Sequence, residues 1–299
     1  MDALLRAINE PETLRVIAAT TTEAVREACR RQRAEGLAAT ILGRALTSGV
    51  LLATLGKGDA ERVRLQFAGG GPIGQILIDA HGDGRVRACT SAQLGPGHVL
   101  NRMLEVEPRP STAAAVGTRG HVVVTRDLGL ATPYQGSVEL HSGEIDEDIE
   151  VYLARSEQLP SVLRAAVILD ADGQILRSAG VLVQGFPGID LSELEPSRAR
   201  LEGLRAVIGA HARGLDELVG LALGGEGFRA MLEHPVRFDC PCGPERALNV
   251  LAALGPADLD ALAVEQEQTE VRCNFCGEVT VVDAPAIRSL AQRLRARQS

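Results

Sequence analysis

The sequence predicts an α+β fold in three parts: an N-terminal α/β-sheet domain over residues 1–185, a metastable helical linker over 186–234 and a small C-terminal domain over 235–299. Predicted strands and helices come in blocks rather than in strict alternation, which favours the α+β class. Near Gly185 the chain changes character, and glycine-interrupted helical patterns begin. Four of the six cysteines then lie in the last fifth of the chain.

The first elements predicted in the N-terminal domain are a strand and two helices. Residues 11–20 alternate and have a β-rich centre, so we expect a strand there. Thr22 is expected to cap a charged helix that ends near Arg33. Residues 37–56 are apolar enough to resemble a membrane span, but Arg44 lies near their middle. Because an arginine at the bilayer centre costs roughly 2.5–3.5 kcal/mol, we predict a buried helix of a soluble domain instead.

An alternating pattern with a period of two begins at Glu61 and predicts a series of strands. Glycine-rich turns separate these strands, and the last two are expected to form a hairpin around Asp170–Gly173. The predicted strand segments are Val63–Phe67, Ile76–Ile78, Val86–Cys89, Val122–Val124, Ser137–Leu140, Ala165–Leu169 and Ile175–Val183. They indicate one domain built around an antiparallel or mixed sheet.

A helix is predicted over residues 143–156, with acidic residues in its first turns and Arg155 near its end, as the helix dipole favours. Its carboxylates spread over most of the helix circumference, so we interpret them as a solvated face rather than as a catalytic cluster. These residues are Glu144, Asp146, Glu147, Asp148 and Glu150.

The linker is predicted to contain helices of low intrinsic stability. One apolar stripe follows helical spacing through Leu215, Leu218, Val219, Ala222 and Leu223, and a looser one precedes it at Leu201, Leu204, Val207 and Ile208. Glycines at 203, 209, 214 and 220 interrupt these helices, and each interior glycine costs roughly 1 kcal/mol relative to alanine. Such helices are expected to depend on docking to the sheet of the first domain.

Composition and charge argue against two classes of partner. The formal charge is −8, and aromatic residues make up 2% of the chain with no tryptophan. An acidic protein repels nucleic acid and anionic membranes, and few aromatic rings are present on which bases could stack. We therefore expect neither a nucleic-acid-binding nor a membrane protein.

The cysteine spacing provides the strongest functional signal. Cys240 and Cys242 form a Cys-Pro-Cys pair, and Cys273 and Cys276 form a Cys-Asn-Phe-Cys pair. The N-terminus shows no secretory signal, which indicates a cytoplasmic location where clustered thiols mean metal or redox chemistry. Two close pairs of thiolates supply the tetrahedral ligands that zinc prefers, so we predict a zinc-binding domain with one Zn²⁺ on four cysteines.

Other readings of the reactive residues are weaker. A thioredoxin-like role for Cys273 and Cys276 requires a helix N-terminus, whereas this pair lies between two predicted strands. His234 is expected to lie at the surface rather than to bind metal, and Cys29 and Cys89 are expected to be packing residues. No catalytic constellation was found, so we do not expect an enzyme; a thiol oxidoreductase is the enzymatic alternative.

With these motifs in place, the chain resembles a redox-regulated bacterial chaperone family, the 33 kDa chaperonin or heat shock protein 33. The resemblance extends beyond the cysteines and covers essentially the whole chain, although the linker is richer in glycine and poorer in charge than is usual in the family. The matching segments are Val124–Gly129, Pro133–Val138, Gly143–Ile145, Ser156–Gln158, Phe238–Cys240 and Pro244–Arg246.

The resemblance implies an ATP-independent holdase that is zinc-bound and inactive when reduced. Oxidation together with unfolding stress would form disulfides Cys240–Cys242 and Cys273–Cys276, release zinc and unfold the linker. The activated protein, commonly a homodimer, would then bind unfolding client proteins. The alternative is a constitutive zinc-ribbon binding protein, but the acidic residues near the second cysteine pair, Glu265, Glu267, Glu270 and Glu278, outnumber Arg272.

Overall fold

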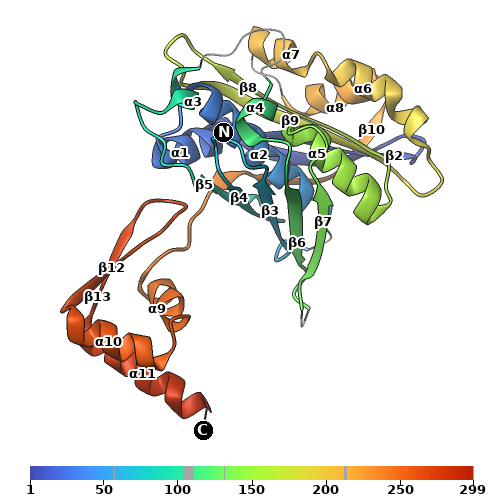
Figure 1. Ribbon diagram of the computed structural model, residues 1–299. Coiled ribbons are helices and arrows are strands. Elements are labelled where there is room, and N and C mark those ends of the chain that lie inside the picture. The colour runs from blue at the N-terminus through green and yellow to red at the C-terminus, as the bar shows by residue number, and fades with distance from the viewer. Residues whose placement is uncertain (57, 104–110, 131, 212–213, 299) are drawn as a thin grey trace. The chain divides into compact units, whose positions relative to one another are not determined.

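A computed structural model describes the chain except residues 57, 104–110, 131, 212–213 and 299. It divides into two compact units, Met1–Asp239 and Cys240–Ser299, which are described separately below. Figure 1 shows the elements of each unit.

The first unit contains a five-stranded antiparallel sheet with the strand order β10-β1-β2-β9-β8. The predicted hairpin is present as β8 and β9. The strand expected over residues 11–20 begins only at Leu14, because Glu12 adopts a left-handed conformation (φ 57°) in the turn before it. The strands are β1 (Ala3–Asn9), β2 (Leu14–Thr20), β8 (Ser161–Leu169), β9 (Ile175–Gly185) and β10 (Phe228–Pro235).

A second sheet of six strands has the order β11-β5-β4-β3-β6-β7 and is antiparallel except for the short β11, which runs parallel to β5. A single sheet was expected from the sequence for this domain, whereas the described residues of the first unit form two. The strands are β3 (Arg62–Ala68), β4 (Ile76–His81), β5 (Arg85–Thr90), β6 (His121–Asp127), β7 (Tyr134–Glu139) and β11 (Arg237–Phe238).

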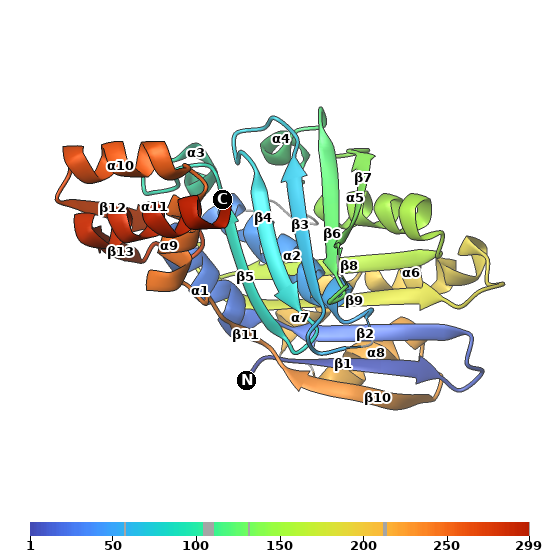
Figure 2. The same ribbon diagram turned by 90° about the horizontal axis from the view of Figure 1, so that it is seen from below.

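Helix α2 (Gly36–Ala53) packs against strands of both sheets, and all of its residues are buried. Figure 2 shows it behind strands β3, β4 and β5. Among the described residues it is the one single helix long and apolar enough for a membrane span, and the prediction of a buried helix is confirmed. Around it lie α1 (Thr22–Gln32) and two single-turn helices, α3 (Val99–Arg102) and α4 (Ala113–Val116). Thr21, not Thr22, is the N-cap residue of α1.

The carboxylates after residue 143 are not a solvated face, and that prediction is wrong. Helix α5 (Ile145–Tyr152) continues into a π-helical turn, Leu153–Glu157. Asp146 is 0% exposed and forms an ion pair of 3.1 Å with the buried Arg44 of α2, while Glu144 pairs with the same guanidinium at 3.0 Å. Asp148 is also buried and accepts hydrogen bonds from the backbone amides of residues 141–143. Because a guanidinium buried in α2 requires counter-charges, Glu144 and Asp146 are drawn into the interior, whereas Asp148 is satisfied there by backbone amides.

Three helices and a 3₁₀ turn cover the other face of the five-stranded sheet. The stripe predicted on α8 is confirmed: Leu218, Val219, Ala222 and Leu223 are buried in a cluster with sheet residues such as Val16 and Val181. The elements are the 3₁₀ turn Leu191–Leu194, α6 (Glu195–Leu201), α7 (Leu204–Ala210) and α8 (Leu215–Leu223).

Two details of this helical segment differ from the sequence analysis. Gly203 and Gly214 are the N-cap residues of α7 and α8, so only Gly209 and Gly220 are interior. Residues 228–234, placed in the helical linker from the sequence, instead form most of strand β10, which pairs with β1. Exposed and half-buried residues alternate only in the second half of β10, so its sequence shows no clear strand pattern.

The second unit is small. Its apolar core contains Leu251, Leu259, Val282, Ile287 and Ala291 among a few other residues. Helices α9 (Pro244–Ala252) and α10 (Pro256–Glu265) are together long and apolar enough for a membrane span, but they are bent by 117° at the break between them. The elements are α9 (Pro244–Ala252), α10 (Pro256–Glu265), the hairpin β12 (Gln268–Arg272) and β13 (Val279–Asp283), and α11 (Ala284–Gln298).

Candidate metal centre

The first cysteine pair lies on a short turn at the start of the second unit. The backbone amide of Cys242 donates to the carbonyl of Cys240 at 2.7 Å, which folds the Cys-Pro-Cys segment tightly. Gly243 follows as the N-cap residue of α9, and Pro244 is in the first turn of that helix. Proline there fits because the first helical amides have no intrahelical partner.

The second pair lies in the turn that joins β12 to β13. The Cys273 amide donates to the Glu278 carbonyl at 2.9 Å, and the Gly277 amide donates to the Cys273 carbonyl at 2.8 Å. Gly277 has a φ of +75°, a left-handed conformation that favours glycine. Gly277 therefore allows the chain to turn around the two thiols.

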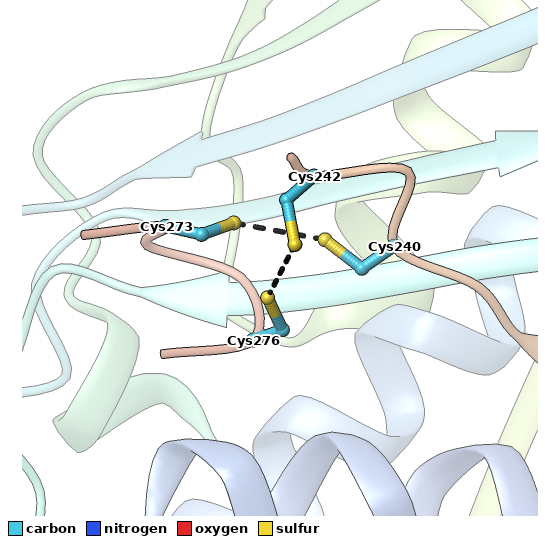
Figure 3. Close-up of side chains that lie close together, drawn as sticks. All are labelled: Cys240, Cys242, Cys273 and Cys276. Atoms are coloured by element: carbon cyan, nitrogen blue, oxygen red, sulfur yellow. Dashed lines mark hydrogen bonds between the residues drawn. The ribbon is translucent and has the colours of Figure 1, made fainter. Parts of the chain in front are cut away.

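All four sulfur atoms lie within 4.8 Å of one another. The Sγ atoms of Cys240 and Cys273 are 3.6 Å apart, and those of Cys242 and Cys276 are 3.1 Å apart. Figure 3 shows the four side chains pointing toward one another from their two segments. A tetrahedral Zn²⁺ with Zn–S bonds of about 2.3 Å would place its sulfurs about 3.8 Å apart. The donor set and the spacing therefore fit a metal ion such as zinc.

The environment of the cluster favours ionisation of one thiol and opposes it at others. Burial disfavours the Cys273 thiolate, but hydrogen bonds from the backbone amides of Cys276 and Phe275 outweigh burial and lower its pKa. Burial, with a contribution from the Cys242 thiol, raises the pKa of Cys276 to about 11. Burial also raises the pKa of Cys242. Four thiolates at one place require a compensating cation, which a bound divalent metal provides.

The remaining residues considered from the sequence lie in the first unit. Cys29 and Cys89 are buried, and burial raises the pKa of Cys29 to about 12, as expected of a packing residue. His234 lies in β10, where its Nε2 atom is 3.3 Å from Asp59, and it is not among the clustered ligands. The backbone carbonyl of Glu278 closes the second turn. This role was not predicted from the sequence, because a main-chain acceptor can belong to any residue type.

Comparison with known proteins agrees with this arrangement. A family model described as "Hsp33 protein" matches residues 2–283. The chain belongs to the Hsp33 family. A 33 kDa chaperonin of Geobacillus kaustophilus is 35% identical over 97% of this chain and 98% of its own length. One of Gloeothece citriformis is 36% identical over 99% of this chain and 98% of its own.

A solved structure extends the similarity to three dimensions. The crystal structure of the 33 kDa chaperonin (heat shock protein 33 homolog) from Thermotoga maritima matches with a TM-score of 0.80 at 27% identity, covering 97% of this chain and 98% of that one. The expected membership of the Hsp33 family is thus confirmed, and with it the identification as a family chaperone. These names describe chaperones.

Proposed function

We propose that this chain is a redox-regulated, ATP-independent holdase that is inactive when reduced. The observation that carries the proposal is the convergence of four cysteine thiols in a small unit of a chain from a chaperone family. In the reduced state, one Zn²⁺ per chain would be bound by Cys240, Cys242, Cys273 and Cys276.

Zinc would supply much of the folding free energy of the second unit. The apolar core of that unit contains few large side chains, and both cysteine turns lack other covalent support. Structural zinc sites typically contribute about 10–16 kcal/mol of binding free energy that is available only to the folded state. Loss of the metal should therefore unfold this unit.

Oxidation would remove the ligands in two two-electron steps. Each pair of thiolates, Cys240 with Cys242 and Cys273 with Cys276, would form one S–S bond and give two electrons to the oxidant. With hydrogen peroxide, each disulfide would consume one peroxide and two protons from solvent and yield two waters, and Zn²⁺ would leave because disulfide sulfur is no longer a thiolate ligand. Pairing within each motif confines each disulfide to a single short turn.

Release of helices α6, α7 and α8 would then expose the client-binding surface. Their buried faces and the sheet beneath them form one apolar cluster, so undocking would uncover apolar area on both sides. The partners would be unfolding proteins, with a homodimer as the oxidised form. Client binding would take place in the cytoplasm and would involve neither nucleic acid nor a membrane.

The deciding experiment is a client-aggregation assay at elevated temperature with and without peroxide, with zinc release followed in parallel. We expect suppression of aggregation only after oxidation, in step with release of one zinc per chain. A Cys29→Ser/Cys89→Ser variant should respond like the wild type. Equal client binding before and after peroxide would instead support the constitutive zinc-ribbon alternative.

The ligand set has a separate test. Cys273→Ser should lose stoichiometric zinc as purified under reducing conditions, because it removes one of four ligands. Metal content by atomic absorption measures this directly. Retention of a full equivalent of zinc would contradict the four-cysteine site.

A further inference from the structure

Helix α6 is attached to the sheet domain by a chain of four charged side chains outside the metal centre. Glu150 of α5 accepts from Arg198 of α6 at 2.8 Å and from Arg164 of β8 at 2.6 Å. Arg164 also pairs with Glu202, the C-cap residue of α6, at 2.5 Å. Alternating charges thus connect α6 to two elements of the sheet domain at two points. We refer to Arg198, Glu150, Arg164 and Glu202 as the Glu150 chain.

Glu150 is the central acceptor of this chain. Its side chain is 11% exposed, and both carboxylate oxygens are used: Oε1 accepts from Arg164 and from the Leu163 backbone amide at 2.7 Å, and Oε2 accepts from Arg198. Arg164 is 7% exposed. Ion pairs so shielded from water are screened little by salt, and removing one partner leaves the other charge uncompensated in a poorly solvated place.

Apolar packing is incomplete where α6 and α7 meet β8. A pocket of about 40 Å³, partly open to solvent, lies there, lined by Arg164, Glu202, Leu201 and Leu204 together with Arg44 and Asp146. Leu201 of α6 lies in the same apolar cluster as α8, and beside this pocket the Glu150 chain adds charged contacts to that apolar attachment.

We propose that Glu150 is a positioning residue that determines how readily α6 leaves the sheet domain, independently of the thiols that bind the metal. The inference rests on the proposed function, in which this helical segment is released. Because the Glu150 chain lies entirely within Met1–Asp239, weakening it should lower the resistance to release while the four cysteines remain reduced.

The test is Glu150→Gln in the full-length, reduced, zinc-loaded chain, read by hydrogen exchange. Glutamine keeps an oxygen that can accept from the Leu163 amide but removes the charge shared by Arg164 and Arg198. We expect α6 amides to exchange about tenfold faster or more, with zinc content unchanged and with β9 amides still protected. Arg198→Gln, which leaves Glu150 paired with Arg164, should show the same effect to a smaller extent.

Glu195→Gln is the matched control, since Glu195 also pairs with Arg198, at 3.3 Å, but is 57% exposed. It should leave α6 exchange within about twofold of the wild type. The proposal is overturned if Glu150→Gln behaves like this control, or if α6 and β9 lose protection equally, which would show a general loss of stability. Both readouts use reduced protein without clients, so this failure is distinct from failure to hold clients after oxidation.

Discussion

Helices α2, α7 and α8 are all largely apolar and each contains glycine, yet they are packed differently. Helix α2 is buried on every side between two sheets, whereas α7 and α8 each bury one face against a single sheet. Similar composition thus yields a central element in one case and a peripheral layer in the other. We therefore expect the number of covered faces, more than residue type, to decide how firmly a helix is held.

The glycines themselves have opposite roles in the two regions. A Cβ atom on Gly43 of α2 would lie 2.7 Å from a Val167 methyl group, and one on Gly49 would lie 2.6 Å from Ile78. By contrast, a Cβ on Gly220 would meet nothing within 4 Å, and one on Gly209 would only reach ordinary contact with Ile168. Glycine permits close packing in α2 but only lowers helix stability in α7 and α8.

The largest expected effect separates α2 from the metal-dependent part of the chain. Removing zinc from the reduced protein with a chelator should abolish protection throughout residues 240–299, because about 10–16 kcal/mol of binding free energy is lost. Amides of α2 should remain protected in the same hydrogen-exchange experiment. Simultaneous opening of α2 would show that the two regions do not differ as described.

The next effect concerns the charge inside α2. Arg44→Met should destabilise the first unit by about 3–5 kcal/mol, since Glu144 and Asp146 would lose their buried counter-charge. Urea denaturation followed by circular dichroism measures the change, with zinc content as the control for an intact second unit. An unchanged midpoint would mean that these carboxylates tolerate burial without the guanidinium.

A smaller effect is expected from crowding α2. Gly43→Ala should destabilise the first unit by about 1–3 kcal/mol, because the added methyl group must displace Val167 and Val25 in a closely packed interior. The same denaturation experiment applies, and Gly58→Ala provides the comparison, since a Cβ atom there would make only ordinary contacts with the Glu61 side chain. A neutral or stabilising result would refute the close-packing role of this glycine.

The smallest effect has the opposite sign. Gly209→Ala and Gly220→Ala should each stabilise the helical segment by roughly 0.5–1 kcal/mol, because neither glycine has a left-handed φ or a steric conflict. The combined variant should need more peroxide or a higher temperature before it suppresses client aggregation. Gly214→Ala, at the N-cap of α8, is the control and should not raise this threshold. A lower threshold in the combined variant would contradict the argument.

The parts that sequence predicted well depend on local patterns. The spacing of Cys240, Cys242, Cys273 and Cys276, the stripe on α8 and the hairpin of β8 and β9 each lie within a short window, and the structure contains all three arrangements. The metal identity and the disulfide pairing remain proposals. The predictions that were wrong concerned residues whose partners are distant in the sequence.

Two examples show why distance matters. The acidic residues of α5 were expected to be exposed because their spacing distributes them around most of the helix circumference. Arg44, about a hundred positions earlier in the sequence, instead pairs with Asp146 in the interior. Strand β10 lacks a strong alternating pattern, and it forms because it pairs with β1, which lies at the other end of the first unit's sequence. Neither partner is visible in a local window, since only the tertiary fold brings these segments together.

The position of β10 has a consequence for how far the released helices can move. The segment 186–227 is bounded by β9 and β10, and both ends are hydrogen-bonded to the same turn: the Phe186 amide donates to Thr13 at 2.9 Å, and the Glu10 amide donates to Gly227 at 3.0 Å. In the order β10-β1-β2-β9, three strand spacings separate β9 from β10, about 14 Å. While β10 stays paired, an undocked segment is a closed loop rather than a free tail. Its apolar side chains therefore keep a high effective concentration near the sheet, which favours rapid, unimolecular return once a client departs.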